Sequence, residues 1–364
     1  MENVRLSGWQ MITMTFCFVC ATTFLLLPGK LIEHAKQYGW IVCVWSFLYG
    51  VLLALLWLHL SKLYPGQSIV QIAMKGLGKW VGGIVAALYI LYFIQVAAWV
   101  TRNLGDFMHT SFMPRTPISV FNIVVLLVCA YAVVKGIESI AMLSELVTPY
   151  IVIAFWAPFT VMLKVWDWRA FNNTEPFRLW DTFIQTKYAL AFPYMELVMF
   201  MMIFPYVKRN IKKSFVIGII SAGVILSVCV YMTIGILGLE RGANHIYPVF
   251  TIFREMKFIG FLEHLESILS VNIFLLVYIK LCLLFYCAVL AICQVFHLER
   301  RGVVAYPLIW IISAYSLLFD NVIENMEWVQ KYLFDYYLLY AVIMPIALIL
   351  CYWMRKWLSG GKLG

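Results

Sequence analysis

Apolar blocks of about twenty residues recur along the whole chain, and they limit the fold more than any other feature of the sequence. Each block has the length needed to cross roughly 30 Å of hydrocarbon as a helix. A backbone at that depth has no water to bind, so it must satisfy its own hydrogen bonds. The sequence therefore predicts an all-α integral membrane protein with about ten transmembrane helices, expected at residues 8–32, 40–62, 79–103, 118–135, 140–164, 187–207, 213–239, 266–297, 303–319 and 334–355.

The charged residues are few and clustered, which decides how the net charge of +9 is interpreted. They make up 12% of the chain, roughly half the share of a soluble domain. The basic ones lie mainly in short loops between blocks, as at 208–213, 300–301 and 355–362. Dense basic residues in short loops are typical of the cytoplasmic side of a membrane. We therefore predict both termini in the cytoplasm, contact with membrane lipid, and no nucleic-acid partner.

The sequence has no motif for covalent chemistry. It contains no G-x-S-x-G, no H-E-x-x-H and no Walker-type glycine loop. The nine cysteines nearly all lie in apolar blocks, where thiols behave as small hydrophobes. Cys17 and Cys20 form a C-x-x-C pair, but without a second pair or a histidine cluster it does not indicate a metal site. We expect neither an enzyme nor a cofactor or metal.

Two of the predicted helices are interrupted. Ala21-Thr22-Thr23 breaks the first apolar run and Pro28-Gly29 follows, while Phe192-Pro-Tyr-Met-Glu196 breaks the sixth. These positions correspond if the chain consists of two five-helix halves, 1–165 and 166–364, within a single membrane domain. An odd number of helices inverts one half relative to the other, and such transporter folds bind ligands where paired broken helices meet. A proline in a membrane helix can alternatively be a simple kink.

Three ionisable residues, Glu145, Glu196 and Lys280, fall within apolar blocks. A charge at bilayer depth costs at least about 2.5–3.5 kcal/mol, so such residues usually face a cavity or each other. Lys280 has apolar residues on both sides along the chain. Its ammonium is interpreted as a fixed cation in the place of a coupling ion, as a proton-titrating site, or as half of a structural ion pair.

Glu196 and the third helix supply further candidate ligand residues. Glu196 is interpreted as a partner for a ligand's amine, as a coupling proton site, or as a cap for freed backbone N–H groups. Glu145 lies about one turn past the expected helix start and is interpreted as interfacial. Tyr92, Gln95 and Val96 share one helix face, which either lines a ligand site or packs on a neighbour.

Four stretches together resemble the B subunit of spore nutrient germinant receptors, within the amino acid–polyamine–organocation superfamily. The resemblance covers essentially the whole chain, and its specificity comes from the order and spacing of the stretches. They are Leu6-Ser-Gly-Trp-Gln10 with Leu25-Leu-Leu-Pro28, then Gln37-Tyr-Gly-Trp40, then Phe192-Pro-Tyr-Met-Glu196 with Phe204-Pro205, and finally Tyr278-Ile-Lys280 with Tyr286 and Gln294-Val-Phe296.

The resemblance implies a LeuT-like fold with a 5+5 inverted repeat, in the inner membrane of a spore. It also implies a subunit that binds an amino acid or similar small nutrient and works with A and C subunits. The family's ligand positions would fall here on Ala21, Thr22, Thr23, Tyr92, Val96, Glu196, Cys282 and Tyr286. The first-helix break is often glycine-rich in relatives, whereas this chain has side chains there.

Three classes of function stay open at this point. A receptor would use ligand binding to shift a conformational equilibrium that partner subunits sense. An amino-acid or amine transporter would use the same pocket for alternating access. A structural scaffold would bind no ligand. A fixed Lys280 in the place of a coupling ion favours the receptor or an uncoupled carrier.

Overall fold

A computed structural model describes residues 5–172, 179–255, 265–319 and 321–358. Within these ranges the chain is helical apart from turns and one isolated bridge, Leu6 to Val207. The helices are α1 Gly8–Ala35, η1 Lys36–Tyr38, α2 Gly39–Leu63, α3 Ile69–Ser111, α4 Ile118–Lys135, α5 Ile137–Met162, η2 Leu163–Val165, η3 Trp168–Phe171, α6 Leu179–Ala189, η4 Leu190–Tyr194, η5 Met195–Met202, η6 Phe204–Tyr206, α7 Ile211–Asn244, α8 Pro248–Glu255, α9 Leu265–Phe296, α10 Gly302–Ser316, α11 Val322–Leu338, η8 Leu339–Ile343 and α12 Met344–Leu358.

The ten predicted membrane segments all correspond to helical structure. Seven helical stretches of the described chain are long and apolar enough to cross a membrane; one of them, Gly8–Leu63, contains both α1 and α2. The tenth predicted segment, 334–355, covers the end of α11, all of η8 and most of α12, so the helical structure begins earlier than predicted. The predicted all-helical membrane fold is confirmed, whereas the division at residue 165 into two repeats stays a prediction.

Local signals in the sequence set where two of these helices begin. The Ser7 hydroxyl accepts a hydrogen bond from the Gln10 backbone N–H, and the Gln10 side chain accepts one from the Ser7 backbone N–H. Ser68 and Gln71 form the same capping box at the start of α3. Both boxes satisfy backbone donors that a helix start leaves free.

The two predicted breaks differ in depth. In the sixth segment α6 gives way to the π-turn η4 and the 3-10 helix η5, and Phe192 leaves helical geometry at φ −125° and ψ 110°. Pro193 explains the position, because a proline disfavours helical angles in the preceding residue. In contrast, α1 is helical from Gly8 to Ala35, and Ala21–Thr23 and Pro28 lie inside it. The first interruption is therefore a feature of side chains rather than an unwound backbone.

Two glycines allow abrupt changes of direction inside long helices. Gly78 in α3 has φ 83° and Gly238 in α7 has φ 76°, and both lie in a region that residues with a Cβ rarely adopt. Each separates a short end piece from the long apolar part of its helix. The short piece after Gly238 leads into α8, which contacts α1 and α9.

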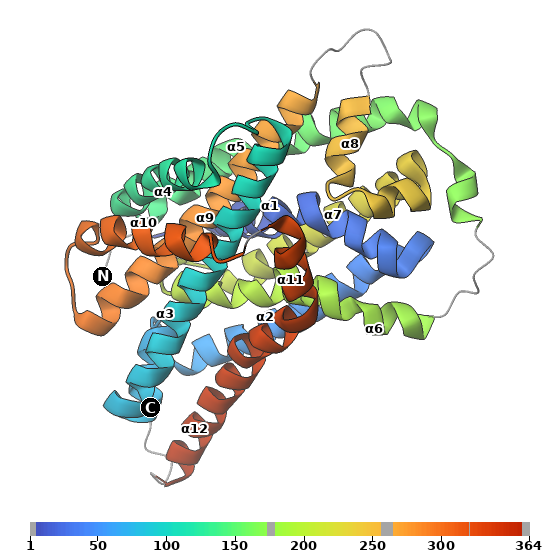
Figure 1. Cartoon of the computed structure of the whole chain (residues 1–364). Helices are drawn as coiled ribbons and strands as arrows, with labels where there is room; N and C mark the ends of the chain where they lie inside the picture. Colours follow the sequence, from blue (N-terminus) through green and yellow to red (C-terminus); the bar gives the residue numbers. More distant parts are fainter. Residues whose placement is uncertain (1–4, 173–178, 256–264, 320, 359–364) are drawn as a thin grey trace.

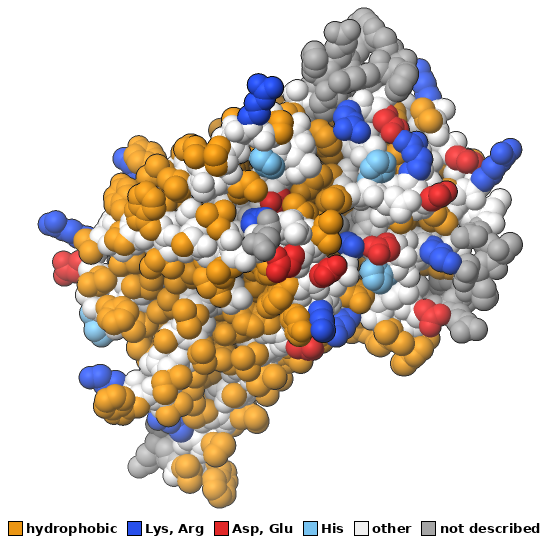
Figure 2. All heavy atoms as spheres, in the orientation of Figure 1, with side chains coloured by type: hydrophobic (Ala, Val, Ile, Leu, Met, Phe, Trp, Pro, Cys, Tyr) orange, Lys and Arg blue, Asp and Glu red, His pale blue; other side chains and the backbone are white. Residues whose placement is uncertain are grey.

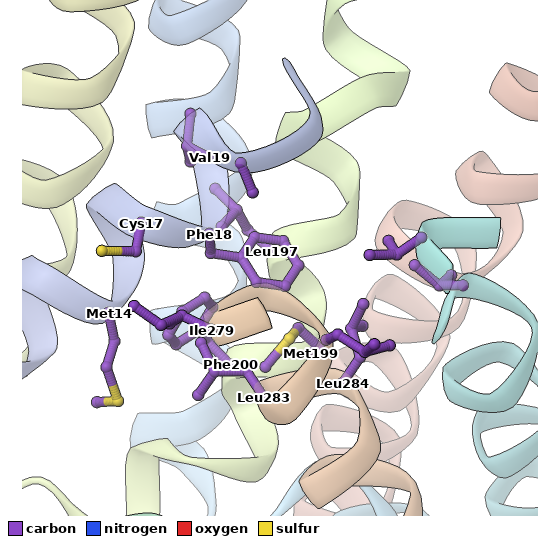
Figure 3. Close-up of a cluster of buried hydrophobic side chains, with 14 of the residues drawn as sticks. Met14, Cys17, Phe18, Val19, Leu197, Met199, Phe200, Ile279, Leu283 and Leu284 are labelled. Carbon is purple, nitrogen blue, oxygen red and sulfur yellow. The ribbon is translucent and has the colours of Figure 1, made fainter. Parts of the chain in front are cut away.

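The core is built around α1 and α9. In Figure 1 these helices lie between α4, α5 and α10 on one side and α2, α6 and α11 on the other. Figure 3 shows α1 side chains such as Phe18 packed against Leu197 and Phe200 of η5 and Ile279 of α9. In the most apolar stretch of α9, 83% of the residues are buried, against 31% for α5. The middle of α9 is therefore the most protected place for a polar group.

The surface separates into apolar and charged regions. Figure 2 shows apolar side chains gathered over α3, α4, α10 and α12, and charged ones around α6, α8 and α11. Large exposed apolar residues such as Trp80, Trp310 and Leu350 belong to the apolar region. A surface of this kind suits hydrocarbon, and the charged region suits a membrane–water boundary.

Candidate functional site

A buried ion pair links α9 to the broken sixth segment. The Lys280 Nζ lies 2.5 Å from Glu196 Oε2, and the two side chains are 0% and 3% exposed. Lys280 comes from the middle of α9, and Glu196 is the second residue of η5, just beyond the break at Phe192. The sequence singled out both residues without pairing them. The structure brings them together.

Further groups surround both charges. Lys280 Nζ also donates to Thr22 Oγ1 of α1 at 3.2 Å, and the Tyr337 hydroxyl donates to Glu196 Oε1 at 2.9 Å. The ammonium lies 4.8 Å from the ring centroid of Phe18 and 4.7 Å from that of Phe192. Ring faces attract cations. A buried ion pair is tolerated when further hydrogen bonds satisfy the donors and acceptors that the pair itself leaves free. The pair therefore connects α1, η5, α9 and α11.

A cavity of about 100 Å³ reaches Glu196, the acidic member of this pair. Its lining includes the buried Glu196 and Tyr337, and also Lys187 and Lys30, which are exposed or half-buried. The lining therefore combines basic side chains near the surface with a buried carboxylate. Its walls come from α1, α3, α6 with η4, and α11, and its other lining residues are Leu26, Leu27, His34, Trp99, Val100, Asn103, Tyr188, Ala191, Phe192, Asn325, Met326, Val329, Gln330, Leu333 and Phe334.

Phe192 separates the cavity from the ammonium. Its ring lines the cavity, yet it also lies over Lys280, which is not among the lining residues. A molecule in the cavity therefore reaches the carboxylate of Glu196 before it reaches Lys280. Aromatic walls around one carboxylate suit a small ligand that carries a positive charge.

Most of the predicted ligand residues are not among those that line the cavity. Of the nine, only Glu196 lines it. Thr22 acts through Lys280, while Ala21 and Thr23 are buried in α1. The hydroxyl of Thr23 has no hydrogen-bond partner among the described residues.

The predicted face of the third helix packs on α11 and η8. Tyr92 stacks on Tyr340 with 4.6 Å between ring centroids, and Gln95 accepts a hydrogen bond from the Tyr336 hydroxyl. Val96 is buried. Of the two interpretations of this face, the structure therefore favours packing on a neighbour.

Cys282 and Tyr286 lie on other faces of α9 than Lys280. They follow Lys280 by two and six residues, so the 3.6-residue period turns them away from it. The ring of Tyr286 lies 5.3 Å from the Arg301 guanidinium carbon, at the start of α10. Neither residue lines the cavity. The two family positions on this helix therefore lie outside the lining of this cavity, and their role in ligand binding stays a prediction.

The polar contacts between α3 and α11 in the cavity wall were not predicted from the sequence. The Asn325 amide donates to Asn103 Oδ1 at 3.0 Å, and both residues line the cavity. One turn away, the Trp99 and Trp328 rings lie 4.8 Å apart. These residues belong to segments more than 200 positions apart in the sequence, and no local pattern indicates their contact.

A second buried ion pair lies within α3 and contacts the end of α10. Arg102 Nε lies 2.9 Å from Asp106 Oδ2, and the two side chains are 4% and 3% exposed. Arg102 Nη1 also donates to the carbonyl oxygens of Ser316 and Phe319, at the end of α10. The predicted third helix ended at residue 103, so Asp106 fell outside it and the pair was not predicted. The i, i+4 spacing was the signal that could have revealed it.

No group of three or more His, Cys, Asp or Glu side chains in the described ranges is arranged to hold a metal. The Cys17 thiol and the Thr148 hydroxyl of α5 lie within hydrogen-bond distance, at 3.2 Å. Cys17 thus packs as a small buried side chain, and the expected absence of metals and cofactors stays a prediction.

The sequence is similar to proteins of spore germination. A family model described as spore germination protein matches residues 5–325. Spore germination protein KB of Bacillus subtilis (strain 168) is 27% identical, with 98% of this chain and 97% of the relative covered. Spore germination protein YndE of the same strain is 24% identical, with coverages of 95% and 94%. These relatives match over nearly their full lengths.

The structure resembles solved transporters. Mhp1, a nucleobase-cation-symport-1 family transporter, matches in a closed conformation with a TM-score of 0.66 at 12% identity, covering 94% of this chain and 78% of Mhp1. A Na⁺-coupled sialic acid symporter matches with a TM-score of 0.66 at 14% identity, covering 97% and 80%. At such identities the likeness shows the fold alone, which is the predicted LeuT-like fold.

Proposed function

Because the chain belongs to the spore germination protein family, we propose that it is the ligand-sensing membrane subunit of a germinant receptor. Its ligand is a small nutrient, such as an amino acid, that enters the cavity and places its amine against Glu196. In this proposal the protein lies in the inner membrane of a spore with both termini in the cytoplasm, and A and C subunits receive its signal. The observation that carries this proposal is the buried Glu196–Lys280 pair at the base of the cavity.

The ion pair couples ligand binding to the conformation of the protein. A ligand ammonium at Glu196 competes with Lys280, whose other contacts among the described residues are Thr22 and two aromatic rings. Since the pair connects four helical segments, weakening it changes the relative stability of their arrangements. A ligand shifts such an equilibrium only by its difference in affinity for the two states. Partner subunits would sense the state that the ligand favours.

Ligand binding is expected to raise the thermal stability of the detergent-purified protein. At a free ligand concentration of 100 times Kd, the free energy of unfolding rises by about 2.7 kcal/mol. The measurement is a thermal shift across amino acids, sugars and nucleosides, with each variant compared against its own baseline. Glu196→Gln should abolish the shift, while Glu138→Gln, an exposed carboxylate at the start of α5, should retain it. Absence of any shift at millimolar ligand would contradict ligand sensing by this chain alone.

We infer that the Lys280 ammonium serves as a fixed cation between α1 and α9. Thr22 of α1 binds it from one side, and α9 carries it from the other. Because this cation is part of the protein, ligand binding should not require Na⁺ from solution. The ligand-induced thermal shift should therefore be the same in sodium, potassium and N-methylglucamine buffers. A shift that requires sodium would contradict this role and would favour the transporter.

A transporter is the second candidate, favoured by the resemblance to two symporters. It would use the same cavity and release the ligand on the other side of the membrane. The discriminating experiment is uptake of a radiolabelled ligand, one identified by thermal shift, into liposomes that contain the purified chain. Uptake above that of empty liposomes supports the transporter. Binding without uptake supports the receptor subunit.

A further inference from the structure

A second cavity, the α2–α7 groove, lies between α2 and α7 and has a volume of about 470 Å³. Both helices belong to stretches long and apolar enough to cross a membrane. Two of the lining residues, Val224 and Val228, are 46% and 42% exposed, so the groove is open on its outer side. It therefore faces the hydrocarbon of the bilayer. The complete lining is Trp40, Val44, Phe47, Val224, Ser227, Val228 and Tyr231.

The two walls of the groove are matching stripes of side chains. The lining positions are 40, 44 and 47 on α2 and 224, 227, 228 and 231 on α7, which is the spacing of a single helix face. Each stripe covers seven residues, or roughly 10 Å of helix. At one end the rings of Trp40 and Tyr231 lie 5.9 Å apart. At the other end Phe47 packs so closely on α7 that a Cβ on Gly223 would lie 2.4 Å from its own Cβ. The groove is therefore a short slot with an aromatic contact at each end.

The chemistry of the slot suits an apolar chain. Between its aromatic ends the polar side chain of the lining is Ser227, and its hydroxyl already donates to the Trp40 carbonyl at 2.7 Å. A polar ligand would thus find no free hydroxyl donor among these residues. A further helix does not fit either, because the axes of contacting helices lie about 8–10 Å apart, whereas a helix is about 10–12 Å wide. A lipid acyl chain is both apolar and thin.

Basic side chains lie at the Tyr231 end of the groove. The short helix η1 contacts α7 and carries Lys36. The short helix η3 carries Arg169, and its Phe171 ring lies 4.8 Å from the Tyr231 ring. Both basic side chains are exposed. Asp167 lies at the same end, where it accepts the Arg169 backbone N–H at 2.8 Å. Tyrosine is typical of membrane–water boundaries, and basic side chains there attract anionic lipid headgroups.

We propose that the α2–α7 groove binds a phospholipid with an anionic headgroup. One acyl chain lies in the slot between the two stripes, and the phosphate lies beside Lys36 and Arg169. The bound chain fills a space that the described residues leave open, so it stabilises the packing of α2 on α7. The groove shares no lining residue with the cavity at Glu196. Its test can therefore fail without affecting the proposed ligand sensing.

The test is photolabelling of the full chain in phosphatidylcholine vesicles that contain a minor fraction of phosphatidylglycerol with a diazirine on one acyl chain. Mass spectrometry of the digested protein should find the label concentrated at residues 40–47 and 224–231. Val228→Trp fills the slot and should lower this labelling roughly tenfold, because losing contact with about two methylene groups is enough for such a change. Val124→Trp, at a valine of α4 that is 54% exposed, should leave it unchanged.

The headgroup is tested with the same diazirine chain on phosphatidylcholine, which should label the groove less than phosphatidylglycerol does. Arg169→Gln should lower this preference about fivefold, the contribution of one basic side chain near a membrane surface. Lys135→Gln, at the exposed end of α4, should leave the preference as it is. Equal labelling by the two lipids would overturn the proposal. So would label spread evenly over the apolar helices, or groove labelling that Val228→Trp does not reduce.

Discussion

Lys280→Met is expected to lower the free energy of unfolding by about 3–5 kcal/mol, because it leaves the Glu196 carboxylate buried without its cation. Tyr337 would be its remaining partner. Methionine retains most of the apolar stem, so lost packing contributes little. The measurement is unfolding of the purified protein in mixed micelles with increasing denaturing detergent. The same variant should also lose the ligand-dependent thermal shift.

The double variant Glu196→Gln with Lys280→Met separates charge from packing. It removes both ions, so it should regain most of the lost stability, since neutral replacements of a buried pair are often tolerated. It should not regain ligand binding, because the carboxylate is absent. If Lys280→Met alone kept full stability and unchanged ligand affinity, the assigned role of Lys280 would be contradicted.

Arg102→Met is expected to have an effect of similar size, about 3–5 kcal/mol, for a related reason. It leaves Asp106 unpaired in the interior and removes the donor to the Ser316 and Phe319 carbonyls. Loss of that donor should loosen the end of α10, so amide hydrogen exchange there should accelerate. Unfolding in mixed micelles measures the first effect, and exchange detected by mass spectrometry measures the second.

Two variants serve as controls for Arg102. Arg102→Lys keeps the charge but not the forked donor geometry, so it should recover only part of the stability. Arg102→Met with Asp106→Asn removes both charges and should restore stability while exchange at the end of α10 stays fast. Unchanged exchange in every variant would show that the carbonyl contacts do not hold α10.

The fold could be predicted because the membrane makes few structures possible. The length of the apolar blocks gave the helices, with α4 at the predicted 118–135. Pro193 marked the break in the sixth segment, because its ring restricts the residue before it. The threonines of the first helix carried no such constraint. Side chains at Ala21–Thr23 are compatible with a continuous helix, and the backbone remains helical there.

The cavity could be predicted only in part. Glu196 and Lys280 stood out because charges are rare in apolar blocks. Asn325 and Tyr337 did not, because α11 has a mixed composition in which a polar or aromatic residue attracts no notice. Which face of a helix meets a neighbour depends on tertiary packing. For the same reason Cys282 and Tyr286, placed by resemblance alone, lie on other faces of α9.

The short bridge at residue 6 has a mechanical consequence. The Leu6 N–H donates to the Tyr206 carbonyl at 2.8 Å, and the Lys208 N–H donates to the Leu6 carbonyl at 3.2 Å. This bridge fastens the chain just before α1 to the chain just after η6. The start of α1 and the end of the sixth segment are thus joined by two backbone hydrogen bonds. A tilt of α1 at that end is therefore transmitted to the sixth segment, and the two segments move together there.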